Sequence, residues 1–210
     1  MELVRWGKDR GVNVTAEVTP HHFSLTDSAC DGYDTNAKMN PPLREAEDVA
    51  AVADGLADGT LDCIATDHAP HTQTEKELQF DQSPFGVIGL ETALAAGITY
   101  LVRDGRMELG RLVQCLSEKP AEILNLPGGR LEEGSDADFL LFDPEETWVV
   151  VPERFHSRSR NSSFVGETLT GRVKATFLRG RLTWRDADTS VRGQAEPVGP
   201  RRSRSGRSPS

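Results

Sequence analysis

The sequence predicts an α/β protein in which a parallel sheet is followed by a β-rich C-terminal module. Two β-rich runs, residues 12–18 and 61–66, enclose an amphipathic helix, and this order is typical of a βα repeat in a parallel sheet. Further helices follow up to a pair of glycines at residues 128–129, and β-rich runs come after them. We therefore expect a boundary near residue 129 between an α/β part and an all-β module.

Helices are expected where apolar side chains recur every three or four residues. The chain opens with a helical pattern that stops at Gly11 and leads into the run at 12–18. In residues 45–56 the apolar side chains fall on one helical face, behind acidic residues in the first turn. The remaining expected elements are helices over residues 87–102 and 109–116, a short helix opened by Pro120, and β-rich runs at 139–142, 148–151 and 173–184 with a hairpin turn at Arg179 and Gly180.

Composition excludes several classes of protein. Lys and Arg number 24 against 33 Asp and Glu, a formal net charge of −9, so we expect no general affinity for nucleic acid. No apolar stretch approaches the about 20 residues of a membrane span, and no signal-peptide pattern opens the chain. Three unclustered cysteines favour reduced thiols and a cytoplasmic protein. The Arg- and Ser-rich end, residues 186–210, is expected to be a disordered basic tail.

Asp67 stands directly after the second predicted parallel strand. In barrel enzymes the C-terminal ends of the strands form the active face, and a buried carboxylate there is costly without a cation or hydrogen-bond donors. A metal-bound carboxylate that also handles a proton fits an Asp at such a strand end; a hydrogen-bonded structural Asp is the alternative. For His71, four residues further on, a functional and a structural role stay equally open.

Other histidines have weaker claims to a site. His21 and His22 follow the first predicted strand, and as neighbours their side chains diverge. At most one of them should point into a pocket, and packing or supporting hydrogen bonds are expected for both. His156 lies among arginines in the β-rich module and is expected to be solvated.

Two loops have compositions suited to ligand contact. Residues 36–44 combine two prolines, which fix the backbone after Asn40, with Asn, Lys and Arg side chains that fit an amide or carboxylate of a small substrate. A proline-stiffened connector with its charges in water is the alternative. Residues 83–86 lead into the helix expected from 87, and Gly86 either lets the backbone approach a ligand or permits the turn.

Several strings of residues, in the right order, resemble dihydroorotases of the longer bacterial type in the amidohydrolase superfamily. The matching strings are residues 16–22, 34–44, 58–72, 83–92, 129–131 and 134–138. The resemblance runs from about residue 3 to residue 184. It implies the C-terminal part of a (β/α)8 TIM-type amidohydrolase barrel over residues 1–128, followed by a small β-rich domain segment over residues 129–185.

The resemblance also implies an activity and a set of site residues. The family interconverts N-carbamoyl-L-aspartate and dihydroorotate in pyrimidine synthesis, with Zn²⁺ as cofactor. By this resemblance Asp67 binds the metal and carries the proton to the leaving nitrogen. Asn40 and His71 are implied as substrate contacts, and the backbone at Phe85 and Gly86 as the segment that holds the ring.

The chain departs from the family pattern at the metal site. The His-x-His pair of the first strand and the middle-strand ligands are absent, and the family pattern gives no metal role to the other strand-end histidines. Asp67 is therefore the one expected zinc ligand in this chain, and one ligand cannot hold Zn²⁺, which normally takes three or more from the protein. A complete barrel takes about 250 residues, so we expect a fragment, inactive alone, whose other zinc ligands lie in a missing N-terminal part.

Three functions stay open on the sequence. The first is the C-terminal part of a dihydroorotase, catalytic when the missing half is present. The second is a non-catalytic dihydroorotase-like partner of aspartate transcarbamoylase, and the third is another cyclic amidase, an allantoinase or hydantoinase. The expected partners are a small-molecule substrate and either a second copy of the chain or aspartate transcarbamoylase, with no membrane.

Overall fold

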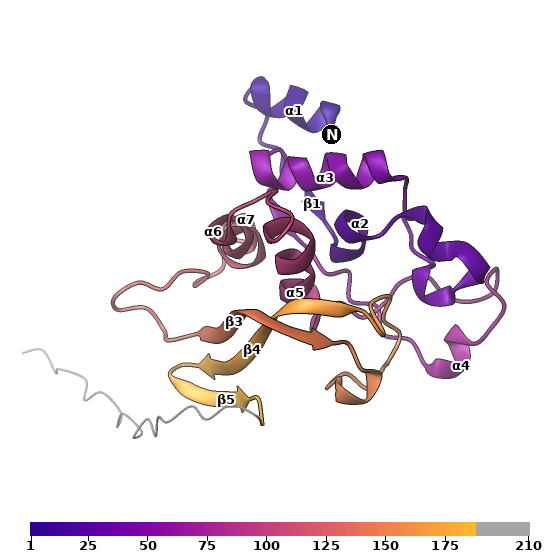
Figure 1. Ribbon diagram of the computed structural model, residues 1–210. Coiled ribbons are helices and arrows are strands. Elements are labelled where there is room, and N and C mark those ends of the chain that lie inside the picture. Colours follow the sequence, from indigo (N-terminus) through magenta and orange to yellow (C-terminus); the bar gives the residue numbers. More distant parts are fainter. Residues whose placement is uncertain (188–210) are drawn as a thin grey trace, which may run out of the picture.

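Helices and a two-stranded parallel sheet lie on one side of the molecule, and a three-stranded antiparallel sheet lies on the other (Figure 1). This computed structural model describes residues 1–187. The helices are α1 (Glu2–Asp9), α2 (Pro20–Ser24), α3 (Ala46–Asp58), α4 (Gln73–Lys76), α5 (Ala93–Gly97), α6 (Leu109–Val113) and α7 (Lys119–Ile123). The strands are β1 (Glu17–Val18), β2 (Cys63–Ile64), β3 (Phe139–Val149), β4 (Thr168–Leu178) and β5 (Arg181–Arg185). Short 3₁₀ segments cover Asp27–Tyr33, Thr35–Ala37 and Pro152–Arg154.

The predicted βα repeat is present, although its strands are shorter than expected. β1 and β2 pair in parallel, with Glu17 opposite Cys63, and α3 runs between them in the sequence. Two backbone hydrogen bonds extend the pairing of β1 and β2 at its ends. The Asp62 N–H donates to the Ala16 carbonyl at 2.8 Å, and the Ala65 N–H donates to the Val18 carbonyl at 3.1 Å. The C-terminal ends of both strands therefore point to the same edge of the sheet.

The helix expected from residue 87 begins later than its apolar pattern predicts. α5 starts at Ala93 and continues as a π-helical segment to Val102. Residues 87–92 lie outside this helix because their backbone groups form hydrogen bonds with other segments. For example, the Ala69 N–H donates to the Val87 carbonyl at 2.8 Å. Leu90, which the pattern assigned to the apolar stripe, is 64% exposed.

The helices expected at 109–116 and from Pro120 are confirmed, and they join. α6, a π-helical segment and α7 follow one another without a break from Leu109 to Ile123. Pro120 is the second residue of α7. Because the helix is continuous, Pro120 lies inside it rather than opening it as expected, and its missing N–H removes one backbone hydrogen bond of the helix.

The antiparallel sheet has the strand order β3-β4-β5. The two β-rich runs expected at 139–142 and 148–151 form the single strand β3, whose pairing with β4 is irregular between Asp143 and Thr147. The predicted hairpin is confirmed, with β4 and β5 joined through Arg179 and Gly180. Both turn residues have positive φ, 49° and 72°, as a two-residue type I′ turn requires.

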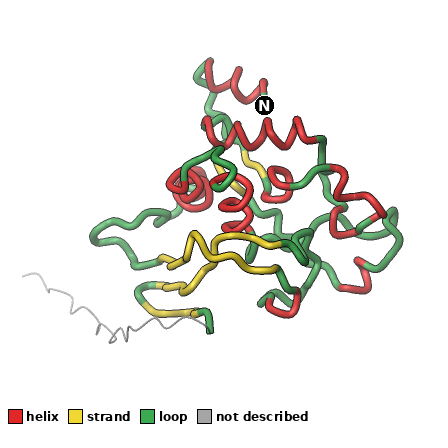
Figure 2. Tube along the Cα trace, viewed as in Figure 1, coloured by secondary structure: helices red, strands yellow, loops and turns green. Residues whose placement is uncertain are grey.

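One apolar core joins the helices to the antiparallel sheet. It includes Leu101 and Leu112 from the helical side with Phe164 and Leu169 from the sheet side, all at most 2% exposed. Figure 2 shows the strands of this sheet running beneath the helices. The division at residue 129 stays a prediction, since the two parts share this core.

The C-terminal end of the described chain is ordered further than expected. Asp186, which the sequence assigned to the tail, is 6% exposed and pairs with Arg172 and Lys174. The predicted tail otherwise lies at residues 188–210, outside the described residues.

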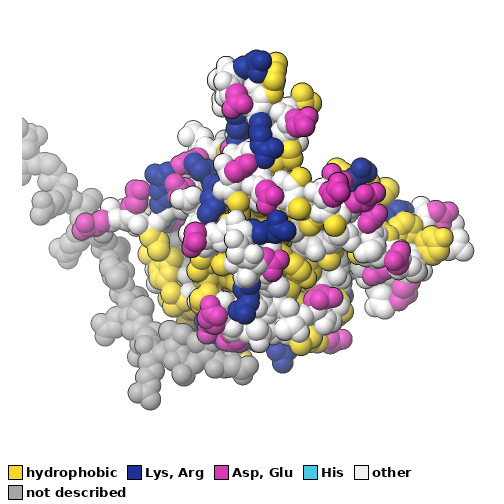
Figure 3. All heavy atoms as spheres, turned by 45° about the horizontal axis from the view of Figure 1, so that its top comes forward, with side chains coloured by type: hydrophobic (Ala, Val, Ile, Leu, Met, Phe, Trp, Pro, Cys, Tyr) yellow, Lys and Arg dark blue, Asp and Glu magenta, His cyan; other side chains and the backbone are white. Residues whose placement is uncertain are grey.

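Charged side chains are mixed over the surface. On the face drawn in Figure 3, acidic and basic side chains alternate, with apolar side chains between them, and the basic ones do not gather into one patch.

Candidate functional site

Asp67 lies on a loop at the C-terminal edge of the parallel sheet, three residues after β2 ends. Its position after a β-rich run suggested a buried carboxylate, but Asp67 is exposed. Its φ is 46°, a left-handed conformation that the short side chain of Asp tolerates better than most. Among residues 1–187 its carboxylate forms no hydrogen bond, so both of its oxygens are available to a ligand.

The loop after Asp67 is paired with the segment that contains Phe85. His68 and Val87 form a parallel bridge, and the Gly89 N–H donates to Nδ1 of His68 at 3.1 Å. Nε2 of His71 lies 2.9 Å from the Phe85 carbonyl. A carbonyl only accepts, so Nε2 carries the proton and the neutral ring offers the lone pair of Nδ1. Two predicted site residues, His71 and Phe85, are thus in direct contact.

The loop of residues 36–44, called the Asn40 loop here, contacts the segment that contains Phe85 and Gly86. The Gly86 N–H donates to the Lys38 carbonyl at 2.9 Å, and Nε2 of His22 donates to the Pro41 carbonyl at 3.0 Å. Asn40 itself is exposed, and its peptide bond to Pro41 is cis. The structure therefore brings together the backbone segments that carry Asn40, His71, Phe85 and Gly86.

The adjacent histidines lie on the short helix α2, and their side chains do not diverge as expected, because their ring centroids are 4.5 Å apart. Successive side chains point to opposite faces only in a strand. The two rings nevertheless differ in surroundings. Thr19 caps that helix, and its hydroxyl donates to Nδ1 of His22 at 2.7 Å. His22 therefore bridges the helix start and the Asn40 loop. His21 is 2% exposed, and burial, with the neighbouring His22, lowers its pKa to about 3. The expected packing and hydrogen-bonding roles thus fit both side chains.

Two buried lysines hold the loop before Gly86, and the sequence did not single them out for this role. Nζ of Lys38 donates to the Ser83 carbonyl at 2.6 Å and lies 4.7 Å from the ring centroid of Phe85. Nζ of Lys76 donates to the Pro84 and Gly86 carbonyls at 3.0 and 3.2 Å. Burial lowers the pKa of Lys76. The cation of Lys38 thus serves the protein's own backbone, not a substrate.

A third residue that sequence reasoning missed is Asn161, in the connection between β3 and β4. Its side chain is buried, and it hydrogen-bonds to the Ala69 carbonyl at 2.9 Å and to the His71 N–H at 3.3 Å. Nothing in the local pattern around residue 161 distinguishes it, because its partners lie about ninety positions earlier in the chain.

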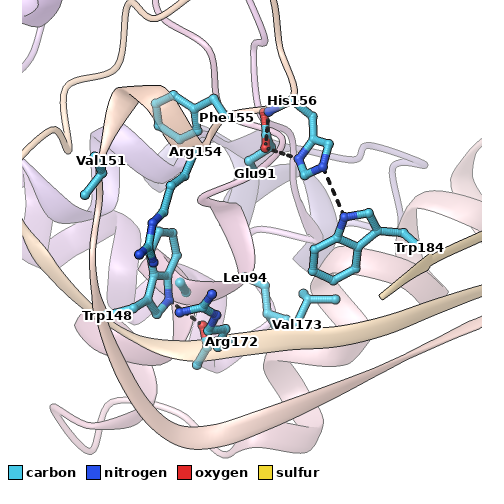
Figure 4. Close-up of a pocket in the computed structure, with 12 residues that line it drawn as sticks. Glu91, Leu94, Trp148, Val151, Arg154, Phe155, His156, Arg172, Val173 and Trp184 are labelled. Atoms are coloured by element: carbon cyan, nitrogen blue, oxygen red, sulfur yellow. Dashed lines mark hydrogen bonds and ion pairs between the residues drawn. The ribbon is translucent and has the colours of Figure 1, made fainter. Parts of the chain in front are cut away.

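A cavity lies elsewhere, between α5 and the antiparallel sheet (Figure 4). It has a volume of about 130 Å³ and none of the predicted site residues lines it. Nε1 of Trp184 donates to Nε2 of His156 at 3.1 Å, and Nδ1 of His156 lies 3.2 Å from Glu91. His156 is therefore held between two partners, although its side chain is 68% exposed.

The electrostatics of Glu91 follow from the same contacts. Burial acts to raise its pKa, but hydrogen bonds from the backbone N–H groups of His156 and Ser157 outweigh burial and hold the pKa below its usual value. The carboxylate therefore fastens the connection after β3 to the residues before α5. Its environment indicates a structural role.

Metal-ligating side chains do not cluster in the described part of the chain. Within residues 1–187, no three His, Cys, Asp or Glu side chains stand close enough together to hold a metal ion.

In residues 1–187, no helix has the length and apolar character needed to cross a bilayer.

Comparison with known proteins gives consistent matches. The model of the Amidohydrolase family matches residues 9–183. The chain is 52% identical over 186 residues to a dihydroorotase of Pelotomaculum thermopropionicum, covering 89% of this chain and 44% of that protein. It is 50% identical to a dihydroorotase of Syntrophus aciditrophicus over the same share of this chain, covering 43% of that protein. The chain thus spans less than half the length of these relatives.

Solved structures show a similar backbone. The L-hydantoinase (dihydropyrimidinase) from Arthrobacter aurescens matches with a TM-score of 0.81 and 32% identity, covering 86% of this chain and 41% of that one. A dihydropyrimidinase from Brevibacillus agri matches with a TM-score of 0.82 and 28% identity, covering 87% of this chain and 41% of that one.

Proposed function

The chain belongs to the amidohydrolase family, and from this premise we propose that it forms the C-terminal part of a dihydroorotase. The observation that carries the proposal is the 52% identity over 186 residues to a protein of that name. The matched hydantoinase structures are less similar in sequence, at 32% or below. β1 and β2 would then be two neighbouring strands of a TIM-type barrel, and the antiparallel sheet would belong to a small β-rich domain.

In the proposed reaction, N-carbamoyl-L-aspartate and dihydroorotate are interconverted by closing or opening a ring amide. For ring opening, Asp67 takes the proton from the attacking water and delivers it to the leaving ring nitrogen. An exposed carboxylate at a strand end, with no hydrogen bond to the rest of residues 1–187, supports this role. The same carboxylate would act as base in one half of the reaction and as acid in the other.

The substrate is proposed to bind across the paired loops beside Asp67. Nδ1 of His71 faces away from its bond to Phe85 and can accept from the substrate. The exposed side chain of Asn40 offers an amide for the polar groups of the substrate. The backbone at Phe85 and Gly86 would hold the ring. Such activity belongs in the cytoplasm, as the three unclustered cysteines suggest.

The described residues do not fit a complete zinc site. Bound Zn²⁺ would polarise the amide carbonyl and lower the pKa of a water, but it needs three or more protein ligands, and no such cluster is present in residues 1–187. We infer that Asp67 is one ligand and that the others come from the part of the relatives that this chain does not match. The partner chain, a second copy or aspartate transcarbamoylase, stays a prediction.

The proposal is tested in a hybrid enzyme, in which this chain replaces the matched segment of the Pelotomaculum thermopropionicum relative. We expect the hybrid to interconvert N-carbamoyl-L-aspartate and dihydroorotate at a rate comparable to the intact relative, which serves as the positive control. A folded hybrid that turns over hydantoin or allantoin, but not dihydroorotate, would favour another cyclic amidase. A folded hybrid without any amidase activity would contradict the proposal.

Asp67→Asn in this hybrid tests the proton transfer. Asn adopts positive φ as readily as Asp, so the loop should keep its shape while the proton acceptor is lost. We expect turnover to fall at least about a hundredfold. Asp9→Asn, at the exposed end of α1, is the matched control and should leave turnover unchanged. Near-normal turnover in the Asp67 variant would remove Asp67 from the reaction.

A further inference from the structure

Asn161 connects the two loops that carry the proposed substrate contacts. It lies in the connection between β3 and β4, and it is 5% exposed. Nδ2 donates to the Ala69 carbonyl at 2.9 Å and to the Gly86 carbonyl at 3.3 Å. Oδ1 accepts from the His71 N–H at 3.3 Å. One side-chain amide therefore touches the backbone on both sides of the site.

Only one orientation of this amide satisfies its neighbours. With Nδ2 toward the two carbonyls and Oδ1 toward the N–H, each contact pairs a donor with an acceptor. The reversed orientation would set an oxygen against two carbonyl oxygens. The main chain adds another bond, since the Asn161 carbonyl accepts from the Ile88 N–H at 2.9 Å. The position of Asn161 is thus fixed by its backbone as well as by its side chain.

We propose that Asn161 is a positioning residue that sets the separation of the His71 loop from the Phe85–Gly86 segment, and with it the affinity for the ring of the substrate. This inference rests on the proposed function. Asn161 acts through backbone atoms of Ala69, Gly86 and His71, and within residues 1–187 it forms no hydrogen bond with Asp67. Its loss should therefore weaken binding and leave the proton transfer intact.

Kinetics of the hybrid enzyme separate this role from a general contribution to folding. For Asn161→Ala and Asn161→Asp we expect KM for dihydroorotate to rise about tenfold or more, with kcat within about threefold of the unsubstituted hybrid and an unchanged pH profile of kcat. The Asp variant has no N–H donor, so a carboxylate oxygen would face the carbonyls of Ala69 and Gly86 and both hydrogen bonds would be lost. A variant that only folded less well would show lower kcat per total protein at an unchanged KM, and this result would overturn the proposal.

The matched control is Thr99→Val, which removes a side-chain hydrogen bond to the backbone of the antiparallel sheet away from the site. The Thr99 hydroxyl accepts from the Thr170 N–H at 2.8 Å and joins the helices to β4. This variant should lose stability without a change in KM. If Thr99→Val raised KM as much as the Asn161 variants do, the loss of any contact between the helices and the antiparallel sheet would raise KM. That result would also overturn the proposal.

Amide hydrogen exchange of the 210-residue chain gives a readout that does not depend on activity. In Asn161→Ala we expect the His71 amide to exchange at least about tenfold faster, because its acceptor is gone. Asn161→Asp keeps an acceptor oxygen and should change it less, and Thr99→Val should not change it. Unaltered exchange at His71 in the Ala variant would overturn the proposal. Failure of the proposed function appears separately, as an inactive unsubstituted hybrid.

Discussion

At the scale of single residues, His21 should make the protein sensitive to acid. Burial, reinforced by His22, lowers its pKa from 6.5 to about 3. The unfolded chain therefore takes up this proton near pH 6.5, and the folded chain does so only near pH 3. Between these values the unfolded state binds more protons, so stability falls as the pH falls. At pH 5 the loss from this one group is about 2 kcal/mol.

Urea unfolding of the hybrid enzyme at pH 7 and pH 5 checks this prediction. We expect His21→Phe to reduce the difference in free energy of unfolding between the two pH values by about 2 kcal/mol. Thr99→Val, which removes no titratable group, is the control and should leave the pH dependence as it was. The same pH dependence in the His21 variant and the parent protein would contradict a neutral, buried His21.

Local signals in the sequence drew attention to some of the proposed site residues. Asp67 and His71 follow a β-rich run, and prolines follow Asn40, but these signals left a structural role open, and the substrate contacts came from the resemblance to dihydroorotases. Lys38 was read as a cation for substrate or solvent, because a sequence does not show that its ammonium group reaches the Ser83 carbonyl. Asn161 had no local signal, since its partners are distant in the chain.

At the scale of elements, Gly171 determines how closely β4 packs on the π-helical segment after α5. Its φ is 95°, and a Cβ there would collide with Cδ1 of Ile98. The carbonyl of Gly171 also accepts from Nε1 of Trp148 at 3.0 Å, opposite the irregular part of β3. Any side chain at this position must therefore displace the Ile98 side chain or move the sheet away from the helices.

We expect Gly171→Ala to lower the free energy of unfolding by about 2–4 kcal/mol, from positive-φ strain and overpacking together. Gly166→Ala is the control for strain alone, because Gly166 has φ 84° and open space around it; about 1–2 kcal/mol is expected there. Adding Ile98→Val removes the colliding methyl group and should recover part of the loss. Equal effects of the Gly171 and Gly166 variants, measured by thermal unfolding, would exclude the packing argument.

The spacing of apolar residues predicted most helices and strands, and it failed where backbone hydrogen bonds to other segments override it. α3, the helices from Leu109 to Ile123 and the β4–β5 hairpin follow their patterns because apolar spacing and turn residues decide them. Residues 87–92 show a helical stripe yet form loop, because their N–H and carbonyl groups are used by the loop after β2 and by Asn161. Such competition arises only in the folded chain.

At the scale of the whole molecule, the described residues would supply one side of the proposed site and not a complete metal centre. It spans 44% of the Pelotomaculum thermopropionicum relative, and its parallel sheet has only β1 and β2 within residues 1–187. The backbone segments of Asn40, His71 and Gly86 are nevertheless held together by bonds internal to this chain. The loops that would bind the substrate can therefore form without the remainder of a barrel.

If the other zinc ligands lie outside this chain, the zinc content of the isolated chain and of the hybrid enzyme should differ. Because no three metal-ligating side chains cluster in residues 1–187 and zinc needs three or more ligands, we expect the purified 210-residue chain to hold less than about 0.1 zinc per molecule. The hybrid enzyme should hold about one or more, and Asp67→Asn should lower the metal affinity of the hybrid by about 10-fold or more. Elemental mass spectrometry after dialysis measures both proteins directly. Tightly held zinc in the 210-residue chain would mean that residues such as His21 and His22 rearrange to bind it, and the proposed sharing of ligands between the two parts would be wrong.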